Sequence, residues 1–397
     1  MEKRQTFTER FDWTLCLILF LFFLISCLSI YSAQTTGQYA VNFVVLQIRW
    51  YVVCSIIIAI IINFDPDQFK KMTWYLYGIG VIFLLILFIV PGSTTSNALI
   101  PIRNNAQSWF QIPGVGLIQP SEFMKTFLIL ALSKVTVQHH EKTKFKTVKT
   151  DMYLLLKLGI ITFIPLAFII KQPDLGTALV IIAIFLGITL VSGITWKILL
   201  PMFGSAAAIG STLILLVLYF PDLLEILGFH PYQFKRIYSW LQPEDFSGGA
   251  AFQLEQSLSA IGSGMMIGKG FSEGTVYIPE AHSDFIYSVI GEDWGFLGGS
   301  IVIGLYFILI YHLTKIALSA TDPFISYICT GVISTVTFHV FQNIGMTIQV
   351  LPITGIPLPF ISYGGSSLMG NMLAMGIIFS IQYYNKPFMF SRNRRAS

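Results

Sequence analysis

A carboxylate that could act as a base stands at the start of an apolar run. Asp284 ends the polar string PEAHSD at 279–284, and the run 285–290 follows it. Partial desolvation at the edge of an apolar layer raises the pKa of a carboxyl group and strengthens it as a base. The structural alternative is that Ser283 or Asp284 caps the following helix by accepting hydrogen bonds from its first N–H groups. A cap explains one of these residues but not the dense polar stretch around both.

Other charged residues lie inside apolar stretches, where they are costly and usually face the bundle interior or a cavity. Glu122 and Lys125 are three residues apart, so they share one helix face and can pair. They either fix helix packing as a buried ion pair or line a charged cavity for an anionic head group. Glu292 and Asp293 point to different faces of their helix. At least one of these two acids is therefore expected to need a Lys or Arg partner.

Two glycine-containing segments could contact an anionic substrate. Lys269 lies within the glycine-rich segment 262–270, and such backbone with a cation can cradle a phosphate. The segment lacks the strand-to-helix context of a Walker A loop, and the composition favours a plain flexible loop at least as much. Ser366 and Ser367 follow the glycine pair at 364–365. This segment could likewise be either a phosphate-binding loop or a plain flexible loop.

The composition is that of a membrane protein. Of the 397 residues, 54% are hydrophobic and 11% are charged, whereas a soluble domain carries about 25% charged residues. The four cysteines lie in apolar runs without a CxxC motif or a Cys/His cluster, so the sequence predicts neither a zinc site nor a disulfide framework. The net charge of +4 comes without aromatic interleaving of the basic loops, so no nucleic-acid partner is predicted.

Apolar runs recur along nearly the whole chain and predict an all-α, polytopic membrane helical bundle. A spanning helix needs about 20 mostly apolar residues. Ten stretches meet this loosely, at about 13–33, 45–63, 72–90, 119–137, 152–170, 175–193, 197–220, 285–311, 324–345 and 366–384. Cytoplasmic loops are enriched in Lys and Arg. With ten spans the basic N-terminal segment, the lysines of 142–149 and the basic C-terminal tail share one side, so both termini are expected to be cytoplasmic.

Three long segments are then expected on the outer face of the membrane. They cover about 91–118, 221–284 and 346–365, and the second, between spans 7 and 8, is the largest. Loops of this length in a compact bundle are usually functional. We therefore treat 1–397 as a single membrane domain whose functional groups gather on the outer face.

Five motifs resemble, in order, the signatures of one family. They are QPSE with Lys125 at 119–125, QPDLGTA at 172–178, QS…AIGSG…GKG at 256–270, PEAHSDFI at 279–286 and PLPFISYGGSS at 357–367. Over essentially its whole length the chain is similar to the SEDS family of shape, elongation, division and sporulation proteins (RodA, FtsW and SpoVE). The string NIGM at 343–346 and the short termini resemble the RodA type.

The resemblance implies a peptidoglycan glycosyltransferase of the bacterial cytoplasmic membrane, which polymerises lipid II on the outer face for cell elongation and shape. The implied partners are the surrounding membrane lipids and a class B penicillin-binding protein that cross-links the glycan strands. The resemblance places the catalytic aspartate at Asp284 and the family's conserved charged pair at Glu122 and Lys125. One departure is that Ser108 precedes Trp109, where many members have an arginine.

In the expected reaction Asp284 takes the proton of the acceptor sugar's 4-hydroxyl group, and attack inverts the anomeric carbon of the donor. Cations would balance the charge of the leaving pyrophosphate. The residues expected to contact the substrate are Glu122, Lys125, Lys235, Arg236, Lys269, His282, Ser283, Ser366 and Ser367. The sequence shows no metal-ligand set, and a divalent cation (Mg²⁺ or Mn²⁺) is left as an alternative.

Two other functions compete with glycosyl transfer. A lipid II flippase would need polar groups at mid-depth and on both faces of the membrane. A non-catalytic scaffold would only hold the penicillin-binding protein in place. The gathering of the motifs on the outer face favours chemistry there.

Overall fold

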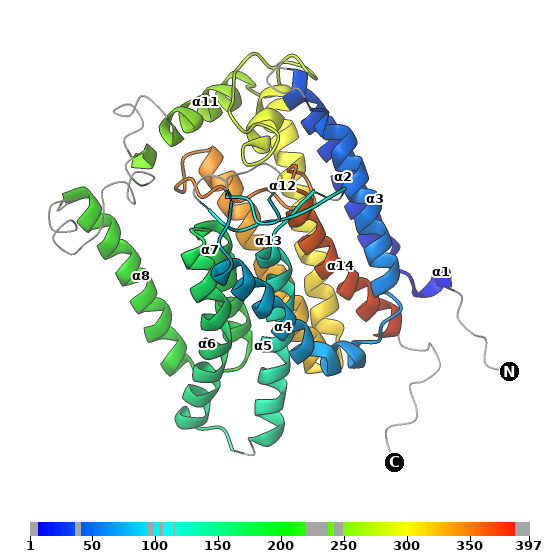
Figure 1. Cartoon of the computed structure of the whole chain (residues 1–397), viewed down its shortest axis with the longest axis vertical. Helices are drawn as coiled ribbons and strands as arrows, with labels where there is room; N and C mark the ends of the chain where they lie inside the picture. The colour runs from blue at the N-terminus through cyan, green and yellow to red at the C-terminus, as the bar shows by residue number, and fades with distance from the viewer. Residues whose placement is uncertain are drawn as a thin grey trace.

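The helices of this chain stand side by side in one bundle (Figure 1). The computed structural model describes residues 7–35, 41–93, 98–102, 106–114, 116–143, 145–219, 237, 239–241 and 249–385. Each of the ten predicted spans corresponds to one helix. These helices are α2 (Trp13–Thr35), α3 (Phe43–Ile61), α4 (Pro66–Ile89), α5 (Pro120–Lys142), α6 (Val148–Lys171), α7 (Leu175–Val191), α8 (Trp196–Tyr219), α12 (Ile286–Ser319), α13 (Pro323–Thr347) and α14 (Gly365–Asn385). The predicted polytopic all-α fold is confirmed.

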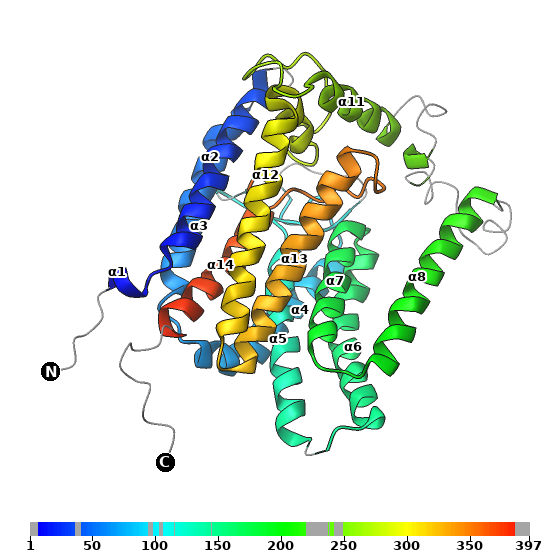
Figure 2. The ribbon, with the colours of Figure 1, turned by 180° about the vertical axis from the view of Figure 1, so that it is seen from behind.

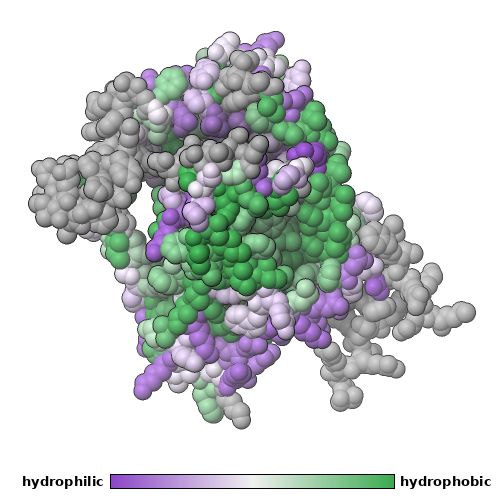
Figure 3. All heavy atoms as spheres, viewed as in Figure 1, coloured by the Kyte–Doolittle hydropathy of each residue, from purple (hydrophilic) through white to green (hydrophobic). Residues whose placement is uncertain are grey.

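The surface of the bundle is that of a membrane protein. In the part of the chain that the structure describes, seven helices are long and apolar enough to cross a membrane, namely α2, α3, α4, α6, α8, α12 and α13. Helix α7 is apolar but has only 17 residues. On the face seen in Figure 3, hydrophobic residues form a broad band between two more hydrophilic ends. The number of ten membrane crossings stays a prediction.

Both described ends of the chain lie at the same end of the bundle (Figures 1 and 2). The short helix α1 (Phe7–Arg10) contacts α14, where the ring of Phe11 stacks on Phe379 at 5.2 Å and Arg10 lies 5.7 Å from the ring of Tyr383. The connection between α5 and α6 also lies at this end. This agrees with an even number of crossings, and the assignment of this end to the cytoplasm stays a prediction.

The opposite end carries the irregular segments. Helix α11 (Ala250–Ser263) lies across it above α12 (Figure 1). Strands β1 (Phe110–Ile112) and β2 (Gly116–Ile118) form an antiparallel hairpin, in which Phe110 pairs with Ile118. Helix α5 is central, because it contacts α4, α6, α7, α13 and α14, whereas α8 leans away from the bundle and contacts α6.

Helix α12 begins later than a cap at Ser283 or Asp284 would require. Its N-cap is Phe285, which makes no side-chain hydrogen bond, so the cap interpretation of both residues is wrong. Residues 279–285 form turns, and Glu280 has a left-handed φ of +56°. The Ser283 hydroxyl donates back to the Glu280 carboxylate at 3.1 Å instead. The polar string therefore lies as a separate turn above the helix.

Helix α12 is also interrupted inside its length. Gly295 has φ +63° and ψ −159°, which breaks the helical hydrogen-bond ladder. The glycine-rich segment 264–270 supplies the missing partners through four backbone hydrogen bonds. These run from Lys269 N to Glu292 O (2.9 Å), Gly270 N to Asp293 O (3.1 Å), Phe296 N to Met265 O (2.9 Å) and Leu297 N to Met266 O (3.1 Å). Glycine is required for this approach, because a Cβ atom on Gly268 would lie 2.1 Å from the Asp293 carbonyl oxygen.

Candidate functional site

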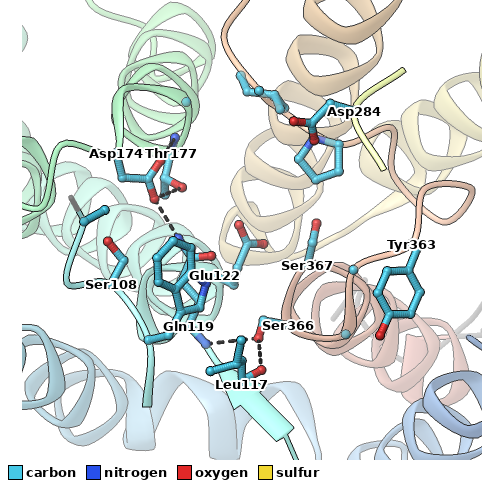
Figure 4. Close-up of a pocket in the computed structure, with 18 of the residues that line it drawn as sticks. Ser108, Leu117, Gln119, Glu122, Asp174, Thr177, Asp284, Tyr363, Ser366 and Ser367 are labelled. Atoms are coloured by element: carbon cyan, nitrogen blue, oxygen red, sulfur yellow. Dashed lines mark hydrogen bonds between the residues drawn. The ribbon is translucent and has the colours of Figure 1, made fainter. Parts of the chain in front are cut away.

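A cavity of about 750 Å³ lies among the segments that carry the family-like motifs (Figure 4). Asp284 reaches it from the turn before α12, and Glu122 reaches it from the first turn of α5. Asp174 stands at the N-cap of α7, and Ser366 and Ser367 lie in the first turn of α14. Five predicted functional positions or motif residues, distant in sequence, thus meet at one cavity.

Asp284 is held in place through its backbone. The buried amide of Asn343 on α13 donates from Nδ2 to the carbonyl oxygens of Asp284 (2.7 Å) and Ile356 (2.8 Å). Gly355 lies beside the carboxylate with a φ of +72°, and a Cβ atom there would come within 3.4 Å of Asp284 Oδ2. Asn343 therefore joins the turn before α12 to the segment that precedes α14, and Gly355 leaves room for the carboxylate.

The predicted pair of Glu122 and Lys125 is present and buried. Lys125 Nζ lies 2.7 Å from Glu122 Oε2, with side-chain exposures of 3% and 7%. Lys125 Nζ also lies 3.3 Å from His339 Nε2, and His339 Nδ1 lies 3.3 Å from the Pro357 carbonyl oxygen. Glu122 and His339 line the main cavity, whereas Lys125 lines a separate small pocket below. The pair therefore links α5 to α13, and only its acid faces the cavity.

The second carboxylate of the cavity, Asp174, is committed to several hydrogen bonds. It accepts from Thr177 N at 3.0 Å, from Thr177 Oγ1 at 2.7 Å and from Gln119 Nε2 at 2.7 Å. Gln119 N in turn donates to Ser366 Oγ at 3.0 Å, and that hydroxyl donates to the Leu117 carbonyl oxygen at 3.0 Å (Figure 4). This network ties the starts of α5, α7 and α14 around the cavity.

Lys269 lies outside the cavity lining and pairs with an acid of α12. Its Nζ lies 2.5 Å from Glu292 Oε1, and the same oxygen accepts from the backbone N–H groups of Thr275 (2.8 Å) and Val276 (3.1 Å). The expectation that Glu292 or Asp293 needs a basic partner is confirmed. Lys235 and Arg236 lie outside the described residues.

His282 and Ser283 support the turn that precedes α12. The ring of His282 stacks on Phe43 at 4.1 Å, and its carbonyl oxygen accepts from Tyr363 N at 2.9 Å. Burial lowers the pKa of His282, and the nearby Glu280 carboxylate opposes this shift. The Ser283 carbonyl oxygen accepts from Ser362 Oγ at 2.6 Å. Neither residue is part of the cavity lining, so their substrate contacts stay a prediction.

Sequence reasoning missed the cation that lines the cavity. Arg49 lies within the apolar run of α3, and its guanidinium carbon lies 5.4 Å from the ring of Trp50, which lines the same cavity. Burial raises the pKa of Tyr363, and the charge of Arg49 opposes this shift. The sequence does contain an indication of this role, because a charged residue inside an apolar span usually faces a cavity. The run itself does not show which face of α3 is turned inward.

The described residues contain no group of three or more His, Cys, Asp or Glu side chains that could hold a metal ion. The carboxylates around the cavity do not converge into a protein-only metal site.

Comparisons with known proteins agree with the motifs. A family model for FtsW, RodA and SpoVE, described as a cell cycle protein, matches residues 9–387. Stage V sporulation protein E of Bacillus subtilis is 33% identical over 337 residues, which cover 83% of this chain and 84% of that protein. The peptidoglycan glycosyltransferase MrdB of Escherichia coli K12 is 31% identical over 390 residues, which cover 97% of both chains.

Two solved structures share the fold. A chain from a peptidoglycan synthase complex, described as coordinating polymerization and crosslinking, superposes with a TM-score of 0.74 at 23% identity, over 94% of this chain and 99% of that chain. The crystal structure of the rod shape determining protein RodA of Thermus thermophilus gives a TM-score of 0.65 at 22% identity, over 95% and 98% of the two chains.

Proposed function

This chain belongs to the FtsW, RodA and SpoVE family of cell cycle proteins, and from that premise we propose that it is a peptidoglycan glycosyltransferase. The relatives RodA and MrdB are both named peptidoglycan glycosyltransferases, and they match the chain over nearly its full length. The substrate that we propose is lipid II, a lipid-linked disaccharide pyrophosphate. The protein would polymerise it on the outer face of the cytoplasmic membrane to serve cell elongation and shape.

The placement of Asp284 carries the mechanistic proposal. It lines a cavity of about 750 Å³ at one edge of the bundle interior, and Asn343 fixes its backbone. The two other carboxylates of that cavity have structural tasks, since Asp174 caps α7 and Glu122 forms a buried ion pair. Those tasks argue against either as the base, because removing its charge would also break the link that it makes.

The proposed step is a single inverting displacement. Asp284 accepts the proton of the acceptor sugar's 4-hydroxyl group as the hydroxyl oxygen attacks the anomeric carbon of the donor. The bond between that carbon and the phosphate oxygen breaks, and the pyrophosphate leaves with the bonding electron pair. Pyrophosphate is a good leaving group, so a second carboxylic acid is not needed to protonate it.

Replacement of Asp284 by Asn tests this assignment in purified full-length protein with lipid II in detergent. We expect a fall in the rate of glycan formation of about 10²-fold or more, since general base catalysis typically contributes 10²–10⁴-fold. Asp322→Asn is the matched control, because Asp322 caps α13 (2.9 Å to Phe324 N) and does not line the cavity. Normal polymerisation by the Asp284→Asn protein would show that another group is the base.

The same assay separates the competing functions. In detergent no membrane has to be crossed, so a flippase would form no glycan there, and a scaffold would form none without its partner's own activity. Glycan formation that depends on Asp284 supports the glycosyltransferase. Because one structure with this fold belongs to a synthase complex, we also propose a cross-linking class B penicillin-binding protein as the partner.

A further inference from the structure

The leaving group of the proposed reaction is a pyrophosphate, yet the cavity is lined by acids. Glu122, Asp174 and Asp284 all line it. Like charges at short range in a partly desolvated site repel each other strongly. A cation must therefore stand near the position where the pyrophosphate departs.

Two of the basic residues expected in that role are engaged elsewhere. Lys125 pairs with Glu122 and does not line the main cavity. Lys269 pairs with Glu292 in the segment that completes α12, also outside the cavity lining. Each ammonium group already balances a carboxylate that is at most 7% exposed. Moving either one to a substrate would leave a buried charge without its partner, which is strongly unfavourable.

The described residues of the loop before β1 that line the cavity carry no charge. Trp109 lines the cavity, but the residue before it is Ser108, whose hydroxyl donates to the Gln172 carbonyl oxygen at 3.2 Å. Ser108 is 1% exposed. The position directly before Trp109 is therefore filled by a buried, uncharged side chain.

Arg49 is the basic side chain that lines the cavity, among the residues that the structure describes. It lies on α3 with Leu46, which is one helical turn earlier and lines the same cavity. The neighbouring side chains Ile48 and Val52 are 40% and 55% exposed on the apolar surface of the bundle. Arg49 thus stands where the cavity borders the lipid-facing surface. A pyrophosphate whose polyprenyl tail stays in the bilayer would lie at that border.

We propose that Arg49 binds the pyrophosphate of the lipid-linked donor and balances its charge as the sugar is transferred. This inference rests on the proposed glycosyl transfer. A guanidinium group suits the role, because its planar fork binds phosphate oxygens in pairs and it stays charged at any working pH. The Trp50 ring beneath the guanidinium group, 5.4 Å from its carbon, limits its movement by a cation–π contact.

Kinetics of purified full-length variants test the assignment. We expect Arg49→Gln to lower kcat/KM for lipid II roughly 10- to 100-fold, the usual effect of losing hydrogen bonds to a charged group. Inhibition by added polyprenyl pyrophosphate should weaken by a similar factor, and inhibition by polyprenyl monophosphate should weaken less. Arg49→Lys should recover part of the loss, since it restores the charge without the fork. Lys171→Gln is the control, because Lys171 is exposed at the end of α6 and does not line the cavity.

A variant that moves the positive charge to a neighbouring position distinguishes loss of the charge from loss of folding. Leu46→Arg added to Arg49→Gln returns a cation to the same cavity from one turn earlier, and we expect it to restore pyrophosphate inhibition in part. Unchanged kinetics and unchanged pyrophosphate inhibition in Arg49→Gln would overturn the inference. So would a loss that neither Arg49→Lys nor the relocated arginine recovers, because folding would then explain it.

The failure of the proposed function gives a different result. In that case the wild-type protein forms no glycan from lipid II. Direct binding of polyprenyl pyrophosphate to the wild-type and Arg49→Gln proteins then still tests Arg49. Equal affinities would overturn the inference, and a roughly 10-fold or greater difference would support it.

Discussion

Replacing Asn343 by Leu should uncouple the position of Asp284 from the rest of the bundle. The amide of Asn343 is fully buried and donates to two carbonyl oxygens, those of Asp284 and Ile356. Leucine keeps a similar volume but donates nothing. Each carbonyl group left buried without a donor costs about 1–3 kcal/mol, so the two together give an upper range of about 2–6 kcal/mol. The bond to the Asp284 carbonyl oxygen is only partly buried, whereas the bond to Ile356 is buried, so we expect the lower half of that range.

The neighbouring residue offers a matched control. Gln342 donates from Nε2 to one carbonyl oxygen, that of Pro352 at 2.9 Å, which does not line the cavity. Gln342→Leu should therefore cost about half as much stability, about 1–2 kcal/mol. It should leave kcat for glycan formation close to the wild-type value, because the position of Asp284 is unchanged.

Thermal unfolding in detergent and polymerisation kinetics below the unfolding temperature measure the two effects separately. A lower kcat in Asn343→Leu, with KM changed less, indicates that Asp284 is displaced from the acceptor hydroxyl group. The reasoning is refuted if Asn343→Leu is no less stable than Gln342→Leu, or if it keeps a normal kcat while folded.

Two further predictions concern the side chains that stabilise α12 and the turn before it. Lys269→Met should clearly lower the unfolding temperature, because it leaves the Glu292 carboxylate, which is 4% exposed, without its cation; an unchanged unfolding temperature would contradict this. Burial lowers the pKa of His282, so the unfolded chain takes up the proton first. The stability that neutral His282 contributes is therefore present above about pH 6.5 and is lost as the pH falls below that value. Unfolding temperatures of wild-type and His282→Asn protein between pH 5 and 8 should converge toward low pH, and a constant difference would contradict the assignment.

Most of the helices could be predicted from the apolar runs, because a run of about 20 apolar residues has few other stable conformations in lipid. The run at about 285–311 correctly predicted most of α12, but it concealed the break at Gly295. That break depends on hydrogen bonds from segment 264–270, which is separate in the sequence. A local pattern carries no information about such partners.

Only those features of the candidate site that depend on local sequence could be predicted. Helical spacing alone predicted the pair of Glu122 and Lys125, and the structure confirms it. The cap at Ser283 or Asp284 was wrong, because tertiary contacts rather than local propensity hold that turn. Arg49 was missed, because an apolar run gives the presence of a helix but not the face that it turns toward a cavity.

The break in α12 has a mechanical consequence. The backbone segment that follows α11 hydrogen-bonds to both sides of the break, to the carbonyl groups of Glu292 and Asp293 before it and to the N–H groups of Phe296 and Leu297 after it. A displacement of α11 would therefore be transmitted to the break in α12, and through the residues before the break to the turn that carries Asp284.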